Sequence, residues 1–298
     1  MRALVIGASG QVGAALVCRL RARGHDVVGT HRDTPVGDTR RLDILDLDAT
    51  GRLIAEAGAA WVFFPAGVTH VDWCEDHPAE AMAANRDAPA AAAREARRHG
   101  AGFVYFSTEY VFDGKRGPYG ESDPANPLSV YGLSKLEGER AVLAATARAL
   151  VVRTTVVYGP EPRGKNFVCQ LLRRAATGER MRVPVDQRSS PTYNQDLAAA
   201  VVALAERGHA GVVHVAGPEV LDRHAFALLA CETFGLDPGF IEPVATADLG
   251  QRAPRPLDAG LRIDHVRRLV PARLRGPREG LAAMRDALRS VDTPGTGR

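Results

Sequence analysis

Three glycines at intervals of three residues constrain the fold more than any other feature of this sequence. Gly7, Gly10 and Gly13 follow a short apolar run and open a helical pattern. Such a turn lets the backbone approach a pyrophosphate closely and places a helix N-terminus beside its negative charge. The sequence therefore predicts a dinucleotide-binding Rossmann domain at the start of the chain. Its cofactor-binding turn would comprise Gly7, Ser9, Gly10, Gln11, Val12 and Gly13.

The first half of the chain alternates short apolar, β-branched runs with longer helical patterns. This alternation predicts βαβ units and an α/β fold with a doubly wound parallel sheet. The expected strands are 3–7, 26–31, 41–45, 61–65, 102–107 and 149–155. The expected helices are 11–23, 49–57, 79–99 and 129–147. Pro89 lies inside the third of these helices, which predicts a kink or a break there.

The pattern becomes less regular after Gly159. Helices are expected over 166–178, 195–207 and 223–235, with a turn-rich stretch over 183–193 and a strand over 211–215. We interpret 1–158 as the dinucleotide-binding domain and 159–298 as mainly a smaller substrate-binding lobe, with return elements near 191–216. The end of the chain, from 291 to 298, is polar and contains Gly and Pro, which is typical of a disordered end.

Composition argues against several other classes of protein. The net charge is +3, and the arginines are interleaved with acidic residues, so nucleic-acid binding is not expected. The four cysteines lie far apart in the sequence, which favours neither a disulfide framework nor a metal site. Neither a signal peptide nor an apolar run of membrane-spanning length is evident, so a soluble cytoplasmic protein without a membrane partner is expected.

A tyrosine and a lysine four residues apart are the strongest candidates for catalysis. Tyr131 and Lys135 would share one helix face, and Lys135 is one of only three lysines among 38 basic residues. A nearby ammonium should lower the pKa of Tyr131, which could then exchange a proton with a carbonyl group as hydride is transferred. Lys135 could also bind the nicotinamide ribose. Ser107 and Thr108 end the preceding strand, where a hydroxyl could hold the reacting oxygen.

The end of the second predicted strand bears on which dinucleotide is bound. The acidic residue that usually selects NAD is missing there, and Thr30, His31 and Arg32 stand in its place. A guanidinium suits a ribose 2′-phosphate, so NADP(H) is preferred, with NAD(H) as the alternative because Asp33 follows directly. At the end of the third predicted strand, Asp43 and Ile44 are placed to contact adenine.

Longer stretches of the chain resemble the dTDP-4-dehydrorhamnose reductase family of extended short-chain dehydrogenase/reductases. The most specific are STEYVFDG at 107–114, PY at 118–119 and PLSVYGLSKLEGE at 127–139. Shorter matches follow in order: GQVG at 10–13, LDI at 42–44, Thr69, VD at 71–72, Asn85, VRT at 152–154, YGP at 158–160, GKNF at 164–167, DQ at 186–187, PTY at 191–193 and RP at 255–256. The resemblance covers nearly the whole chain and is weakest beyond residue 260.

The resemblance implies a reductase of the C4 ketone of a nucleotide-linked 4-keto-6-deoxysugar, with NADPH as reductant. The catalytic set would be Thr108, Tyr131 and Lys135. Ala66 would lie beside the nicotinamide. The residues facing the nucleotide sugar would be Glu109, Tyr110, Asn166 and Arg255. The partner is thus a small-molecule nucleotide sugar, and a homodimer is left open.

The chain also departs from the family pattern at several positions. Glu109 replaces the usual Asp, Val156 the usual Trp, and Ser189 a usual glycine. FPAG at 64–67 replaces an Asn-Ala-Ala stretch. These changes leave the identity of the sugar open among related keto-sugars.

Three other functions share this framework. A 4,6-dehydratase is disfavoured because Tyr110 stands where elimination needs a stronger base. A nucleotide-sugar 4-epimerase needs only Tyr131, Lys135 and tightly held NAD, and it stays open. A non-catalytic regulatory subunit, similar to the β subunit of methionine adenosyltransferase, also keeps the Tyr and the Lys and stays open.

Overall fold

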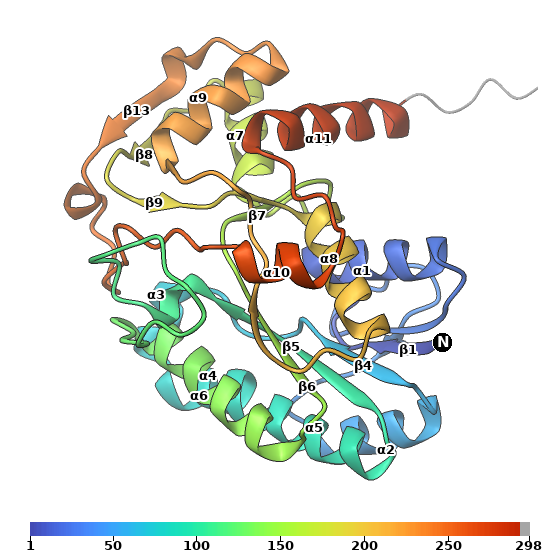
Figure 1. The fold of residues 1–298 in the computed structure, drawn as a ribbon. Helices are drawn as coiled ribbons and strands as arrows, with labels where there is room; N and C mark the ends of the chain where they lie inside the picture. The colour runs from blue at the N-terminus through green and yellow to red at the C-terminus, as the bar shows by residue number, and fades with distance from the viewer. Residues whose placement is uncertain (293–298) are drawn as a thin grey trace, which may run out of the picture.

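A seven-stranded, entirely parallel sheet forms the centre of the computed structural model, which describes residues 1–292 (Figure 1). The strand order is β11-β6-β5-β4-β1-β2-β3. The bounds are β1 Arg2–Val5, β2 Asp26–His31, β3 Arg40–Arg41, β4 Trp61–Phe64, β5 Gly102–Thr108, β6 Ala149–Thr154 and β11 Gly211–His214. The predicted Rossmann-like fold is confirmed. Because the winding direction changes between β1 and β4, the carboxyl ends of these strands border the crevice where such folds bind ligands.

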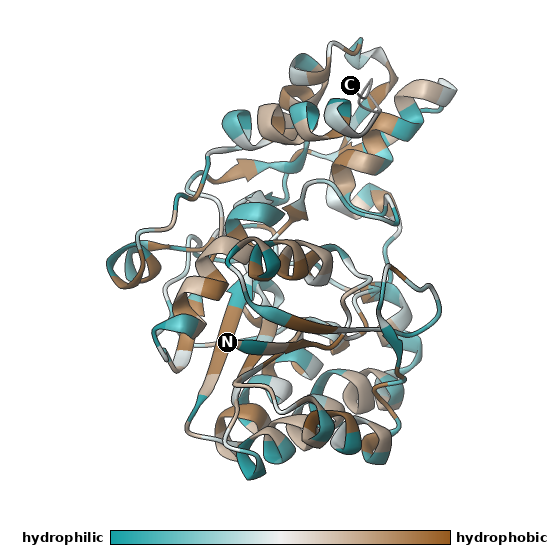
Figure 2. Cartoon of the chain, turned by 90° about the vertical axis from the view of Figure 1, so that its right-hand side faces the viewer, coloured by the Kyte–Doolittle hydropathy of each residue, from teal (hydrophilic) through white to brown (hydrophobic). Residues whose placement is uncertain are grey.

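Helices cover both faces of this sheet, so the strands are apolar on both sides. On one face lie α1 Gln11–Ala22, α8 Asn194–Glu206 and α10 Asp264–Leu269. On the other lie α2 Leu47–Ala57, α5 Ala88–Arg98 and α6 Val130–Ala145. Alternate residues of β1 enter the two cores, Ala3 and Val5 one core and Leu4 the other. Figure 2 shows these strands as mainly hydrophobic segments between the helical layers.

The helical region expected over 79–99 is interrupted, as Pro89 predicted. It comprises α4 Pro78–Met82, a π-helical segment Ala83–Asp87 and α5, preceded by the short helix α3 Val71–Asp76. Pro89 occupies the first turn of α5, where a missing N–H group is tolerated. The π segment turns Asn85 into the protein, where it is completely buried.

A second, smaller core lies above the sheet in Figure 1 and is formed by the C-terminal half. Its helices are α7 Phe167–Thr177, α9 Arg223–Phe234 and α11 Pro277–Asp292. Its paired strands are β7 Val157–Tyr158 with β10 Thr192–Tyr193, β9 Arg188–Ser189 with β12 Leu221–Asp222, and β8 Met181–Pro184 with β13 Ile241–Val244. The short 3₁₀ segments are η2 Glu109–Val111, η3 Pro238–Phe240 and η4 Thr246–Leu249. The division of the chain after residue 158 stays a prediction.

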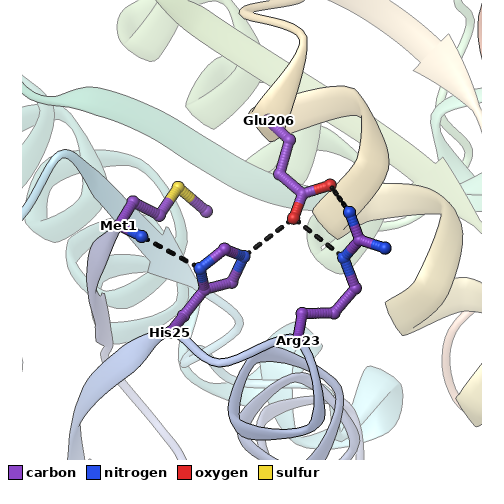
Figure 3. Close-up of polar contacts among 4 residues, drawn as sticks. All are labelled: Met1, Arg23, His25 and Glu206. Carbon is purple, nitrogen blue, oxygen red and sulfur yellow. Dashed lines mark hydrogen bonds and ion pairs between the residues drawn. The ribbon is translucent and has the colours of Figure 1, made fainter.

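Helix α8 and strand β11 come late in the sequence but pack against the N-terminal half. β11 pairs with β6, and α8 packs beside α1. At the end of α8, the Glu206 carboxylate accepts two hydrogen bonds from the Arg23 guanidinium, at 2.9 and 3.0 Å, and lies 2.7 Å from the His25 ring (Figure 3). His25 in turn contacts the Met1 amino group at 3.0 Å. This cluster fastens the returning helix to the beginning of the sheet.

Two predictions about elements are wrong. The third strand ends at Arg41 instead of residue 45, because the Asp43 carboxylate accepts the Leu45 N–H at 3.0 Å and turns the chain toward α2. The predicted disordered end began at Val291, but Val291 and Asp292 belong to α11. The rest of that segment lies outside the described residues. Within 1–292, no helix is both long and apolar enough to cross a membrane.

Candidate active site

The glycine turn after β1 forms a cradle without side chains. Gly7 has φ +99°, and a Cβ there would lie 3.0 Å from the Ala66 backbone nitrogen. A Cβ on Gly13 would overlap the carbonyl oxygen of Gly7. The turn is closed by a 3.1 Å hydrogen bond from Gly10 N–H to Gly7 O, and Gly7 N–H donates to Thr30 Oγ1 at 3.0 Å. The geometry therefore requires glycine at these positions, as expected for a backbone approached by a ligand.

The N-terminus of α1 opens onto this cradle with free donors. Its N-cap residue, Gly10, has no capping side chain, and the first turn contains no acidic residue. The Gln11 side-chain nitrogen Nε2 is buried and has no hydrogen-bond partner among the described residues. Ser9 is buried within the turn. Unpartnered donors at a helix N-terminus suit the pyrophosphate of a dinucleotide, so this chain fits such a cofactor.

The residues predicted to contact the adenosine half lie at the ends of β2 and β3. The exposed Arg32 side chain forms an ion pair with Asp33, with 2.8 Å between Nε and Oδ2. Asp43 is exposed and holds the turn described above, whereas Ile44 is half-buried against the core of the α2 face. Their roles toward adenine and the ribose phosphate stay predictions.

Ala66 follows β4 and lies directly against Gly7, so it borders the same cradle. The next residues are held by Asn85, which the sequence analysis did not single out as a site residue. Its side-chain amide pairs with both backbone groups of Val68 at 3.0 Å and donates to Ser134 Oγ at 2.9 Å. The π segment that carries Asn85 thereby fixes the loop beside the expected nicotinamide position. Asn85 matches the family pattern, but that match does not assign it this role.

Thr108, Glu109, Tyr110 and Tyr131 are gathered at the carboxyl end of β5. Thr108 Oγ1 donates to Glu109 Oε2 at 2.8 Å and accepts the Tyr110 N–H at 3.2 Å. The Tyr110 ring packs edge-on against the Tyr131 ring, with 5.5 Å between ring centroids. Tyr131 is 8% exposed and Thr108 is 5% exposed. The strand end and the first turn of α6 thus bring these residues into one buried cluster.

The pKa of Tyr131 is raised above its ordinary value of 10, so the expectation that Lys135 would lower it is wrong for this structure. Burial of the phenol is the main cause, and the negative charge of Glu109 adds to it. Burial disfavours the charged phenolate, and the hydrogen bond with Thr108 only partly offsets this effect. Tyr131 therefore holds its proton at neutral pH.

Lys135 is buried one helical turn after Tyr131. Its Nζ lies 4.1 Å from the centroid of the Tyr105 ring, and burial lowers the pKa of Lys135 to about 7, against an opposing effect of Glu139. Glu139 accepts hydrogen bonds from Arg153 at 2.7 and 2.9 Å and from the Ser107 hydroxyl. This buried network connects α6 to β5 and β6 directly behind the lysine.

Three of the residues predicted to contact the substrate, Glu109, Arg255 and Asn166, differ in their hydrogen-bond partners and charges. Burial raises the pKa of Glu109. Arg255 donates to Asp72 at 3.0 Å, while its Nη1 is buried without a hydrogen-bond partner among the described residues. Asn166 is buried, caps α7 by accepting the Cys169 N–H at 3.1 Å, and donates to Gly159 O at 2.8 Å. The Asn166 side-chain amide is thus already used in two structural hydrogen bonds. Its role toward the substrate stays a prediction.

Arg223 also lies near the cluster at the end of β5. Arg223 begins α9, and its guanidinium lies 5.0 Å from the centroid of the Phe167 ring. Its charge lies close enough to affect the pKa of both Glu109 and Tyr110. The sequence analysis missed it, because nothing distinguishes it among so many arginines.

Val156 has φ +37°, a strained conformation for a β-branched residue, and such strain is concentrated at functional sites.

Taken together, the glycine cradle, the Thr108–Tyr131 cluster and the buried Lys135 can support one kind of chemistry. The cradle fits a dinucleotide phosphate, and Tyr131 can donate a proton to an oxygen held near Thr108. Glu109, Arg223 and Arg255 offer charged and polar contacts for a polar substrate. Such an arrangement suits reduction of a ketone on a polar, anionic molecule.

Comparison with known proteins gives a consistent result. The family model described as RmlD substrate binding domain matches residues 1–290. A dTDP-4-dehydrorhamnose reductase of Mycobacterium tuberculosis is 39% identical over 260 residues, which cover 85% of this chain and 82% of that protein. A probable dTDP-4,6-dihydroxy-2-methyloxan-3-one 4-ketoreductase of Streptomyces antibioticus is 35% identical over 303 residues, which cover 100% of this chain and 99% of that protein.

A solved structure with the same fold contains a bound cofactor. The dTDP-4-dehydrorhamnose reductase of Bacillus anthracis, in complex with NADP, superimposes with a TM-score of 0.87 at 27% sequence identity. The match covers 98% of this chain and 99% of that one.

Proposed function

This chain belongs to the family described as RmlD substrate binding domain, and from that premise we propose that it reduces the C4 ketone of a nucleotide-linked 4-keto-6-deoxysugar with NADPH. It is an NAD(P)-dependent oxidoreductase acting on a nucleotide sugar. The relatives at 39% and 35% identity are named a dTDP-4-dehydrorhamnose reductase and a probable dTDP-4,6-dihydroxy-2-methyloxan-3-one 4-ketoreductase. The observation that carries the proposal is the cluster of Thr108 and Tyr131 at the end of β5, beside the glycine cradle.

NADP(H) is the preferred cofactor and NAD(H) the alternative. A related reductase is known in complex with NADP. In this chain the cradle of Gly7, Gly10 and Gly13, with the unpartnered Gln11 amide, would hold the pyrophosphate. The bound nicotinamide would supply the hydride. Arg32, Asp43, Ile44 and Ala66 would contact the rest of the cofactor.

The protein's own contribution is to hold the ketone and supply a proton. Tyr131 would donate its phenolic proton to the C4 oxygen, and its raised pKa keeps that proton available at neutral pH. Thr108 would position the same oxygen. Lys135 would contact the nicotinamide ribose. The buried surroundings exclude water and strengthen each of these interactions.

The substrate would occupy the side of the cluster formed by the C-terminal half. Glu109 and Tyr110 would face the sugar, and the unpartnered Nη1 of Arg255 is a buried donor suited to an anionic or hydroxyl oxygen. Arg223 would add a second positive charge on this side. The cytoplasm stays the predicted cellular location, and whether the protein forms a homodimer stays open.

The test follows the fate of the hydride. The purified protein is incubated with a dTDP-4-keto-6-deoxyhexose and NADPH carrying deuterium at the transferred position. A reductase places one deuterium at C4 of the sugar, detected by NMR and mass spectrometry, with one NADPH consumed per product. A 4-epimerase would instead interconvert the two C4 epimers of a dTDP-hexose that carries a hydroxyl group at C4, with its bound NAD and without net consumption of cofactor. An unchanged sugar with bound cofactor would favour the regulatory subunit.

A further inference from the structure

A loop of the C-terminal half reaches the phosphate-binding turn. Arg163 Nη2 donates a hydrogen bond to Ser9 Oγ at 3.1 Å, across 154 positions of the sequence. Ser9 is buried, whereas Arg163 is exposed. Within residues 1–292, Arg163 has no carboxylate within ion-pair distance, so most of its donors are available to a ligand. A cation therefore lies over the cradle from the opposite lobe.

The loop that carries Arg163 is fastened at both ends. Asn194 Nδ2 donates to Pro160 O at 2.8 Å, and Asn166 Nδ2 donates to Gly159 O at 2.8 Å. Arg173 adds a bond to the backbone of the same loop at 3.0 Å. Both asparagines are almost completely buried. The position of Arg163 beside the turn is thus built into the packing of α7 and α8.

Arg163 approaches from the opposite lobe toward the end of β2, where two other arginines lie. Arg32 forms its ion pair with Asp33 there, and Arg41 lies opposite His31 in the pairing of β2 with β3. The pKa of Asp33 is lowered, mainly by the hydrogen bond from Arg32, with smaller effects of the charges of Arg163 and Arg41. The positive charges of Arg32, Arg163 and Arg41 thus all act on the one carboxylate of Asp33.

We propose that Arg163 is a ligand of the 2′-phosphate of bound NADPH and, together with Arg32 and Arg41, sets the preference for NADP over NAD. This inference rests on the proposed function. In a Rossmann domain the adenosine ribose lies at the end of the second strand, which is where these arginines meet. A phosphate monoester carries nearly two charges and three acceptor oxygens, which suit several guanidinium groups. Cofactor binding would then tie the two halves of the protein together.

The test compares two cofactors in three proteins. Dissociation constants for NADPH and NADH are measured by titration calorimetry for the wild type, Arg163→Gln and Lys165→Gln. Lys165 is an exposed cation on the same loop, so its variant removes the same charge two residues away. We expect Arg163→Gln to weaken NADPH binding about tenfold, the loss of one charge-assisted contact, and NADH binding less than about twofold. Lys165→Gln should change neither constant appreciably.

Each remaining outcome is decisive. Equal weakening of NADPH and NADH by Arg163→Gln would place the side chain on the pyrophosphate and overturn the assignment to the 2′-phosphate. Unchanged binding of both would leave Arg163 with only its bond to Ser9 and would also overturn it. Arg163→Lys should recover part of the NADPH affinity, because charge returns without the planar fork. If the wild type binds neither cofactor, the proposed function itself fails.

Discussion

The proton donor proposed for this site owes its properties to burial. Tyr131 is packed against Tyr110 and lies near the carboxyl group of Glu109, and both burial and that charge raise its pKa. A phenol that keeps its proton is a suitable acid for a ketone oxygen that gains negative charge as hydride arrives. The protonated phenol is the form of Tyr131 that the proposed reduction requires at neutral pH.

Glu109 should reduce the stability of the folded protein at neutral pH. Its folded pKa is raised by burial, so the folded state binds the proton more tightly than the unfolded state. Stability is then lost as pH rises from the unfolded value of about 4.3 through the folded pKa. We expect Glu109→Gln to increase the free energy of unfolding at pH 7 by about 1 kcal/mol, with no gain at pH 4.

Urea unfolding at the two pH values measures this difference. Glu109→Asp, which keeps the charge, serves as the control and should show no gain at pH 7. A glutamine variant that is equally stable or less stable than the wild type at pH 7 would show that burial of the Glu109 carboxylate does not reduce the stability of the protein.

Residues with a distinctive spacing could be predicted, and residues that depend on the tertiary structure could not. Tyr131 and Lys135 are separated by one helical turn, and lysine is rare in this chain. Arg163 and Arg223 carry no such signal, because arginine is the usual basic residue here and their positions depend on loops that fold back over the sheet. The direction of the pKa shift of Tyr131 was also beyond the sequence, since it is decided by burial.

At the level of elements, α6 is the part of the fold on which the site depends most. It carries Tyr131, Lys135 and Glu139 at intervals of four residues, so all three lie on its inner face. Glu139 joins α6 to β6 through Arg153 and to β5 through Ser107. The network thereby fixes the helix relative to the strand that ends in Thr108.

Breaking the buried ion pair between Glu139 and Arg153 should lower the stability of the protein. In Glu139→Gln, Arg153 would stay buried without its carboxylate, and we expect the free energy of unfolding to fall by about 3 kcal/mol. Glu137→Gln on the same helix breaks a more exposed pair with Arg140 and should cost less than about 1 kcal/mol. Chemical unfolding of both variants makes the comparison. Equal losses would argue against a special role for the Glu139 network.

Helices and strands with a clear hydrophobic periodicity were predicted to within a few residues. Element ends that depend on a local side-chain hydrogen bond were not. β2 and α1 begin where their patterns begin. The third strand is short because Asp43 turns the chain, a local hydrogen bond that an apolar pattern does not reveal. No helix was predicted where α11 lies, although its buried Leu281 and Met284 pack into the smaller core.

At the scale of the whole molecule, late segments of the chain complete the dinucleotide-binding half. Glu206 at the end of α8 holds Arg23 and His25. Burial acts to raise the pKa of Glu206, but the hydrogen bonds from these partners outweigh it and lower the pKa. This contribution to stability is present above the unfolded pKa of about 4.3 and is lost as pH falls through the folded value.

Glu206→Gln should therefore lower the melting temperature by about 2 °C at pH 7, and the difference should disappear near pH 3. Glu232→Gln is the control, because it breaks a more exposed pair with Arg278 within the C-terminal half and should shift the melting temperature less. Calorimetric scans at both pH values provide the test. A difference that persists unchanged at low pH would contradict the ionic explanation.

The central claim is that Tyr131 gives its proton to a sugar ketone while nicotinamide gives the hydride. It is tested most directly by following NADPH oxidation at 340 nm with a dTDP-4-keto-6-deoxyhexose, in the wild type and in Tyr131→Phe. The account predicts that the variant loses about 10²- to 10⁴-fold in turnover while binding NADPH with unchanged affinity. Turnover by the variant at the wild-type rate, or no turnover by the wild type with any nucleotide keto-sugar, would contradict it.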